Sequence, residues 1–149
     1  MPLTLVGGGV ASLQDLLEAM TYAPTCIAAD GGAKLALEAG VELAAVIGDF
    51  DSIGQCLSQV PVERRIHISE QDSTDFDKAM RYISAPLVIA IGFTGGRIDH
   101  QLAALNVLVK YPQNPCVMIG ETELTFLCPP GVTLPLSKGD VVSLFPMAP

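Results

Sequence analysis

Apolar and polar residues are distributed along most of the chain in a way that predicts two kinds of element. Short apolar runs predict buried strands over residues 3–9, 25–30, 43–51, 65–69 and 86–93. Segments of mixed polarity between them predict helices over residues 12–20, 31–40, 73–84 and 97–111. Strands that alternate with helices are typical of a parallel sheet covered by helices on both faces. The pattern therefore predicts a doubly wound, mostly parallel α/β fold.

Capping signals support three of these helices. Ser12 and Asp15 have the spacing of a capping box, in which each side chain bonds the backbone of the other residue. Gly40 closes the second helix. The third helix has Ser73 or Thr74 at its start, and either residue is a suitable N-cap. The predicted ends of these helices thus rest on specific residues as well as on polarity.

The pattern changes after about residue 115, where no helix is predicted. Strand-like segments over residues 116–120, 123–129, 132–136 and 140–146 follow one another, joined by Gly, Pro and Asp turns. We expect the first of them to complete the sheet and the rest to open a β-rich unit. The predicted boundary gives an α/β domain over residues 1–125 and the beginning of an incomplete C-terminal β domain over residues 126–149.

Composition agrees with a sheet that is covered on both faces. Half of the 149 residues are hydrophobic and 14 more are glycine, and central strands of a parallel sheet are apolar on both sides. The longest apolar run, residues 86–93, has the length of a strand rather than of a membrane span. The N-terminal sequence MPLTLVGGG has no basic region followed by a long apolar stretch, so we expect a cytoplasmic protein. The four scattered cysteines suggest neither a zinc site nor a disulfide framework, and we expect them in the core.

The charge of the chain is acidic and unevenly placed. A net charge of −8 argues against nucleic acid or an anionic membrane as a partner, because no basic surface is available to neutralise phosphates. Seven of the nine aspartates fall between residues 30 and 99, where they follow or flank the predicted strands: Asp30, Asp49, Asp51, Asp72, Asp75, Asp77 and Asp99. Ligands of open parallel sheets bind beyond the carboxyl ends of the strands. We therefore expect these carboxylates to meet at one edge of the sheet.

The spacing of Asp49 and Asp51 is the first indication of a metal site. If the backbone is still extended there, residues two apart project to the same side. Carboxylates held close together repel one another unless a cation or a shared proton relieves them. Oxygen ligands without histidine favour Mg²⁺ or Mn²⁺, and Mg²⁺ held by a few carboxylates completes its shell with water and phosphate oxygens. Lys78 and Arg97, two of only eight basic residues, lie in the same region and suit a phosphorylated substrate.

Each signal also has an ordinary structural interpretation. A single Asp-x-Asp is weak, and Asp72 and Asp75 are also placed to favour the positive N-terminus of the predicted 73–84 helix. His100 is more often a packed helix residue than a base. The glycines at residues 7–9 and 92–96 also suit tight turns after strands. The joint pattern is much more specific than any one of its parts.

Four motifs together resemble those of thiamine pyrophosphokinases. They are ADGGA at residues 29–33, IGDFDS at 47–52, EQDSTDFDKAM at 70–80 and GGRIDHQLAALN at 95–106. They occur in the family's order and at close to its spacing, and the resemblance extends over about residues 1–149. It implies that residues 1–125 are a catalytic domain that binds MgATP. The implied reaction transfers the pyrophosphoryl group of ATP to the hydroxyl of thiamine and yields AMP, and the implied assembly is a homodimer.

The resemblance also implies roles for individual residues. It makes Asp49, Asp51 and Asp75 the magnesium ligands, with Asp77 and Asp99 as candidate further ligands. The implied ATP contacts are Gln71, Asp72, Thr74 and Lys78, together with a phosphate cradle of Gly95, Gly96 and Arg97. The acids implied to face thiamine are Asp30 and Asp99. The predicted catalytic group is accordingly Asp49, Asp51, Asp75, Lys78, Arg97 and Asp99.

The sequence departs from the family at its C-terminus. The family continues beyond residues 142–146 into a β-sandwich domain that supplies an aromatic residue to the thiamine pocket, whereas this sequence contains no Trp. We therefore expect the chain to be a fragment. Two other functions stay open: a metal-dependent phosphohydrolase, which would turn ATP over without an acceptor alcohol, and a non-catalytic module that binds Mg²⁺ and nucleotide.

Overall fold

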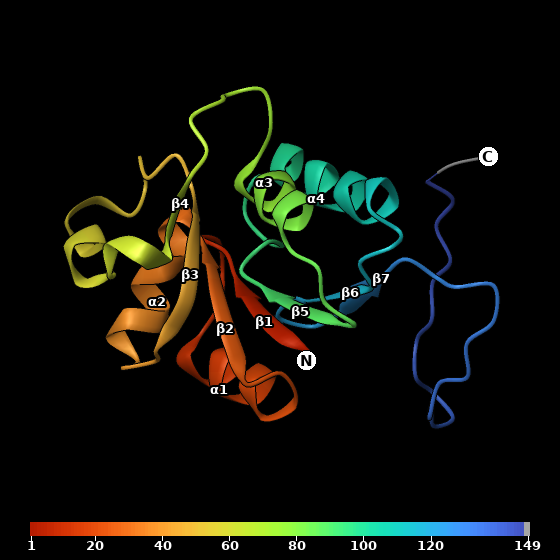
Figure 1. Cartoon of the computed structure of the whole chain (residues 1–149). Coiled ribbons are helices and arrows are strands. Elements are labelled where there is room, and N and C mark those ends of the chain that lie inside the picture. The colour runs from red at the N-terminus through yellow and green to blue at the C-terminus, as the bar shows by residue number, and fades with distance from the viewer. Residues whose placement is uncertain (148–149) are drawn as a thin grey trace.

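A computed structural model of the protein describes residues 1–147 and has a seven-stranded sheet at its centre (Figure 1). The strands lie in the order β4-β3-β2-β1-β5-β6-β7, and all pairs are parallel except β6 with β7. Their bounds are β1 Leu3–Val6, β2 Thr25–Ala29, β3 Leu43–Gly48, β4 Arg65–His67, β5 Val88–Ile91, β6 Cys116–Ile119 and β7 Leu124–Phe126. The predicted mostly parallel sheet is confirmed.

Helices cover both faces of this sheet. Their bounds are α1 Leu13–Tyr22, α2 Ala33–Glu38, α3 Asp75–Tyr82 and α4 Ile98–Lys110, with 3₁₀ segments at Asp30–Gly32, Gly54–Gln59 and Val62–Arg64. One apolar core lies under α3 and α4 and includes Met80 and Val107, and a second lies under α1 and α2 and includes Leu16 and Ala36. Figure 1 shows α3 and α4 together on one side of the sheet and α1 and α2 on the other. The doubly wound arrangement is thus confirmed.

The central strand β1 is covered by helices on both sides, and three of its four residues are apolar. All four of its residues are buried. Leu5 belongs to the core under α3 and α4, while Val6, the next residue, belongs to the core under α1 and α2. Consecutive side chains of a strand point to opposite faces, so a strand covered on both sides is mostly apolar. Thr4, the polar residue of β1, is buried with its hydroxyl donating to the Ala23 carbonyl at 2.7 Å.

The order of the strands reverses between β1 and β5, and two glycine loops meet there. The Gly7 amide donates to the Ile91 carbonyl at 2.8 Å. A Cβ added to Gly7 would lie 2.6 Å from the Gly92 carbonyl oxygen, and Gly92 itself has a φ of +76°. Only residues without a side chain allow the backbones to approach this closely. This reversal is the point at which doubly wound sheets bind their ligands.

The predicted caps are largely as expected. Ser12 and Asp15 form the reciprocal capping box of α1, with the Asp15 amide 3.1 Å from Ser12 Oγ and the Ser12 amide 2.7 Å from Asp15 Oδ2. Gly40 follows α2 with a φ of +69°. Of the two candidates for α3, Thr74 is the N-cap. Ser73 bonds Glu70 instead.

The expectations for two C-terminal strands and for two of the cysteines are corrected. Strands over residues 132–136 and 140–146 are not formed: residues 127–147 contain no strand, and Val141, Leu144 and Phe145 are exposed there. An extended segment becomes a strand only when its backbone hydrogen-bonds to a neighbouring strand, and residues 127–147 form no such pairing. Antiparallel β7 nevertheless fits the start of a β-rich unit. Of the four cysteines expected in the core, Cys128 is exposed and Cys56 is half-buried.

No helix within residues 1–147 combines the length and the apolar character needed to cross a bilayer.

Candidate functional site

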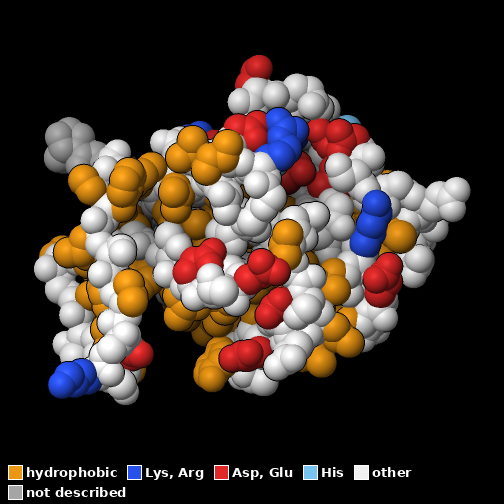
Figure 2. Space-filling model, turned by 180° about the vertical axis from the view of Figure 1, so that it is seen from behind, with side chains coloured by type: hydrophobic (Ala, Val, Ile, Leu, Met, Phe, Trp, Pro, Cys, Tyr) orange, Lys and Arg blue, Asp and Glu red, His pale blue; other side chains and the backbone are white. Residues whose placement is uncertain are grey.

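The loops that follow β1 to β5 emerge at the same edge of the sheet, because these strands are parallel. This is the upper edge in Figure 1. In Figure 2 acidic side chains gather at the same edge, with basic side chains among them. The predicted site residues come from the loops after β2, β3, β4 and β5 and from the first turns of α3 and α4. The loops that carry the acidic residues therefore lie at one edge of the sheet, as expected.

Asp49 and Asp51 lie in a turn rather than in extended backbone. Strand β3 ends at Gly48, and Phe50, between the two aspartates, has a φ of +67°, in the left-handed region. The Asp51 amide donates to Asp49 Oδ1 at 3.2 Å, which closes the turn. One carboxylate oxygen from each of Asp30, Asp49 and Asp51 lies within 4.8 Å of the others. The two carboxylates converge as predicted, but a turn brings them together instead of the alternation of a strand.

Asp30 stabilises this turn by accepting backbone hydrogen bonds from the residues that follow it. It follows β2, has no exposed surface and adopts a φ of +38°. Its Oδ1 accepts the Ile53 amide at 2.8 Å and its Oδ2 accepts the Ser52 amide at 3.4 Å. Burial, with a hydrogen bond to Asp49 adding to it, raises the pKa of Asp30 to about 6. The carboxyl group that the sequence placed against thiamine thus holds the backbone just after Asp51.

Asp49 is held by polar groups from a distant part of the chain. Its Oδ2 accepts Gln71 Nε2 at 2.7 Å and lies 3.3 Å from Lys78 Nζ. Burial by itself would raise the pKa of Asp49, but hydrogen bonds from Asp30 and Gln71 outweigh it and hold the pKa well below its usual range. The structure therefore brings the predicted metal ligand Asp49 into contact with Gln71 and Lys78, which were predicted to contact ATP.

Lys78 is the buried cation of the site. Its side chain is 2 % exposed, and its Nζ lies 3.3 Å from Asp49 Oδ2 and 3.8 Å from Asp75 Oδ1. A buried ammonium group is stable only when it is paired, and two carboxylates meet that need here. The pKa of Asp75 is raised by burial, against the influence of Lys78, and the charges of Asp49 and Asp51 raise it further. Asp75 therefore faces the same acidic group from the start of α3.

Asp77 has a different role from the one considered for it. Its Oδ2 accepts Lys110 Nζ at 2.7 Å and its Oδ1 accepts the Tyr111 hydroxyl at 2.6 Å. Both partners lie at the C-terminal end of α4. Residues two apart on a helix point in different directions, so Asp77 ties α3 to α4 while Asp75 faces the site.

Arg97 and Asp99 pair with each other. Arg97 Nε and Nη2 lie 3.1 and 2.6 Å from the two oxygens of Asp99, and both side chains are exposed. They follow Gly95 and Gly96, which have φ values of +79° and +75°. Among residues 1–147, neither side chain forms a hydrogen bond or ion pair with Asp49, Asp51 or Asp75. The predicted contacts of Arg97 with phosphate and of Asp99 with thiamine stay predictions.

Three polar residues near the site, Ser52, Glu70 and Arg81, had no predicted role. Ser52 Oγ donates to Asp51 Oδ1 at 2.8 Å. The Glu70 carboxylate accepts from the Asp72 and Ser73 amides and from Arg81 Nη2. Ser52 and Glu70 lie within the recognised motifs, so their position was visible in the sequence. Their partners were not, because bonds from a side chain to nearby backbone leave no periodic signal.

The carboxylates can hold a divalent cation. Asp30, Asp49 and Asp51 offer oxygen ligands alone, with no histidine or cysteine among them, and this donor set suits Mg²⁺ better than zinc. Two amides already occupy the oxygens of Asp30. Asp30 is also buried, whereas Asp49 is half-buried and Asp51 is exposed. On accessibility, Asp49 and Asp51 are the residues better placed to coordinate a metal, with Asp75 beside them.

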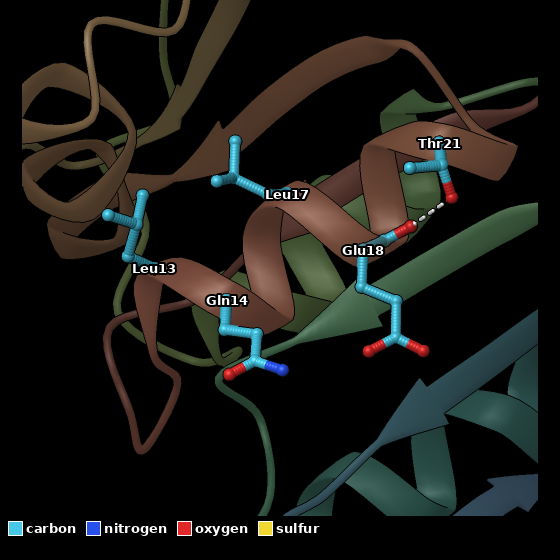
Figure 3. A pocket seen from close by; sticks show the side chains of 5 residues that line it. All are labelled: Leu13, Gln14, Leu17, Glu18 and Thr21. Carbon is cyan, nitrogen blue, oxygen red and sulfur yellow. Dashed lines mark hydrogen bonds between the residues drawn. The ribbon is translucent and has the colours of Figure 1, made fainter.

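A shallow hollow elsewhere on the surface is not part of this site. It lies along one face of α1 and is lined by Leu13, Gln14, Leu17, Glu18 and Thr21 (Figure 3). All five residues belong to one helix, and Thr21 bonds only the backbone carbonyl of Glu18, at 2.7 Å. No group of titratable side chains converges there, so the candidate site is the acidic edge of the sheet.

Fold and site define a doubly wound α/β domain with an acidic site at its carboxyl edge. Residues 16–119 match the family model described as thiamin pyrophosphokinase, catalytic domain. Because that match covers well over half of the chain, the chain belongs to this family.

Individual relatives agree with the family match. The chain is 33% identical over 116 residues to thiamine pyrophosphokinase of Bacillus subtilis, covering 72% of this chain and 54% of the relative. It is 33% identical over 95 residues to thiamine pyrophosphokinase 1 of Arabidopsis thaliana, covering 55% of this chain and 36% of the relative. The chain thus spans about a third to a half of the length of these curated relatives.

Solved structures show the same fold. A crystal structure of thiamine pyrophosphokinase from Bacillus subtilis superposes with a TM-score of 0.72 at 25% identity, covering 88% of this chain and 66% of that chain. One of thiamin pyrophosphokinase from Geobacillus thermodenitrificans superposes with a TM-score of 0.64 at 28% identity, covering 80% and 59%. The predicted fold class and family are confirmed.

Proposed function

We propose that this domain transfers the pyrophosphoryl group of ATP to the hydroxyl of thiamine in a Mg²⁺-dependent reaction, giving thiamine diphosphate and AMP. The observation that carries the proposal is the contact of the buried Lys78 ammonium with Asp49 beside Asp51 and Asp75. A cation and several carboxylates close together are what a metal–triphosphate complex requires. The choice of thiamine as the acceptor rests on the family to which the chain belongs.

The transfer moves one group between two oxygens. The hydroxyl oxygen of thiamine forms a bond to the β-phosphorus of ATP, and the bond from that phosphorus to the oxygen bridging to the α-phosphate breaks. The bonding electrons leave with AMP, and the hydroxyl proton is released. Charge on the phosphoryl oxygens must be neutralised while the two bonds exchange. Bound Mg²⁺ would supply part of that neutralisation at Asp49 and Asp51.

The residues of the chain have separable tasks in this proposal. Lys78 neutralises phosphoryl oxygens from within the protein, where low exposure strengthens its field. Gln71, Asp72 and Thr74 contact ATP from the loop before α3, and Arg97 leaves its pairing with Asp99 to close on phosphate over Gly95 and Gly96. Asp99 is then free to face the acceptor. Asp30 acts mainly by holding the turn that carries Asp51. A cytoplasmic location and a homodimer belong to the same proposal.

The proposal is tested by following ATP with ³¹P NMR in the presence of Mg²⁺, with and without thiamine. We expect equal amounts of AMP and thiamine diphosphate, formed only when thiamine is present. Loss of ATP without thiamine would identify a phosphohydrolase instead. Nucleotide binding with no turnover under either condition would identify a binding module.

A further inference from the structure

The loop between β4 and α3, residues 68–74, carries residues that the proposed function needs, and a single carboxylate holds it in shape. Glu70 Oε2 accepts the backbone amides of Asp72 and Ser73 at 2.9 and 3.1 Å. Its Oε1 accepts the Ser73 hydroxyl and, at 2.9 Å, Arg81 Nη2. Four donors from three residues thus converge on one side chain.

Arg81 connects this loop to the helix that carries the buried cation. It lies on α3, near the end of the helix, whereas Lys78 and Asp75 lie nearer its start. The contact between Arg81 and Glu70 therefore fixes the loop relative to α3. Because hydrogen bonds between charged groups are short and strong, such a bond restrains the loop more than a neutral one would.

The restraint reaches the acidic group through the next residue in the chain. Gln71 follows Glu70 directly, and its Nε2 donates to Asp49 Oδ2 at 2.7 Å. At the other end of the loop, Thr74 caps α3 through the Asp77 amide at 3.2 Å. The loop thus spans the turn after β3 and the start of α3, and Glu70 fixes its middle.

We propose that Glu70 is a positioning residue for nucleotide binding, which holds Gln71 and Thr74 in place by anchoring the 68–74 loop to Arg81. This inference rests on the proposed function, since it takes the loop to contact ATP. Glu70 itself has its oxygens occupied by the protein, so it acts through its neighbours and not on the substrate.

The test compares variants of the loop with a matched ion pair elsewhere. Glu70→Gln keeps the size of the side chain but loses the charge that Arg81 and Ser73 bond. We expect the KM for MgATP to rise about tenfold, the scale of one lost charge-assisted hydrogen bond, with kcat within about threefold of wild type. Arg81→Lys retains a cation and should keep a KM near wild type, whereas Arg81→Met should raise it.

The control is Glu42→Gln. Glu42 pairs with Arg64 at 2.6 Å, so the variant also breaks a Glu–Arg pair, but one remote from the 68–74 loop. We expect its KM to be unchanged. Calorimetric binding of MgATP, which does not depend on the acceptor, should show the same order of affinities. This binding measurement gives the contribution of Glu70 to nucleotide affinity even if turnover is slow.

Each outcome separates the inference from the function it rests on. If wild type binds MgATP and Glu70→Gln binds it as tightly as Glu42→Gln does, the inference fails and the proposed function stands. If Glu70→Gln lowers kcat and leaves KM unchanged, Glu70 is not a positioning residue for binding. If wild type binds no nucleotide, the proposed function fails and this inference fails with it.

Discussion

Lys78 and Asp49 are 29 residues apart in the chain, yet the Lys78 ammonium lies 3.3 Å from Asp49 Oδ2. The pair joins α3 to the turn after β3. Since Lys78 is buried and also lies near Asp75, one cation compensates two carboxylates that would otherwise repel each other.

Replacing Lys78 by Met should therefore destabilise the protein and change its response to Mg²⁺. Removing one partner of a buried pair costs about 3–5 kcal/mol, and the partial exposure of Asp75 places the expected loss at the lower end of that range. We expect a lower Tm and at least a hundredfold loss of turnover. Added Mg²⁺ should raise the Tm of the variant more than that of wild type, because the carboxylates have lost their internal cation. Equal shifts in thermal melts would contradict a metal site at Asp49.

Asp51→Asn should nearly abolish turnover and leave the fold intact. Asp51 is exposed, and within residues 1–147 its side chain bonds only the Ser52 hydroxyl, so its loss leaves no buried group unpaired. It does remove a charged oxygen ligand, and we expect the concentration of Mg²⁺ needed for half-maximal activity to rise at least tenfold. Asp140→Asn, at a surface aspartate that bonds the Ser137 amide, is the control. A well-folded Asp51→Asn protein with wild-type activity at limiting Mg²⁺ would refute the assignment.

Phe50 allows a direct measurement of backbone strain at the site. Its φ of +67° is unfavourable for any residue with a side chain. Phe50→Gly and Phe50→Ala both lose the ring contact with His67, at 5.3 Å between centroids. They differ by one methyl group, whose main effect at this φ is on backbone strain, so we expect the Gly variant to be the more stable by about 1 kcal/mol in urea unfolding. An Ala variant at least as stable as Gly would show that the turn is not strained.

Glu70 should contribute to stability in a way that depends on pH. Hydrogen bonds from Ser73 first, and from Arg81 next, lower its pKa from 4.5 to about 2. A carboxyl group whose pKa is lower in the folded than in the unfolded state stabilises the fold while it is charged. The difference in unfolding free energy between wild type and Glu70→Gln should be constant above about pH 5 and should shrink as the pH falls from 4.5 toward 2. A difference that does not change over the accessible part of this window would contradict the role of Glu70.

The sequence predicted the features that depend on local pattern. The alternation of strands and helices gave the order of elements, and the spacing of Ser12 and Asp15 gave a cap that the structure contains. The acids were placed at one edge because parallel strands end together. Prediction failed where a partner is distant or a backbone angle is unusual. Nothing near Asp77 indicates that Lys110 and Tyr111 bind it.

The position of Phe50 illustrates the second kind of failure. A large aromatic residue at a left-handed φ is contrary to local preference. The turn that contains it is followed directly by the Ile53 amide, which donates to Asp30. The apolar segments after residue 131 are the opposite case. Their composition favours strands, but a strand requires an adjacent edge, which no local pattern reports.

The central position of β1 has a consequence for folding during synthesis. Its residues pair with β2 on one side, Leu3 opposite Thr25, and with β5 on the other, Leu3 opposite Val88. The first pairing can form soon after β2 leaves the ribosome, but the second must wait until β5 has been made. During that interval the nascent chain carries an apolar strand with one open edge. Such edges are the usual sites of wrong association, so this half of the sheet is where a chaperone would be most useful.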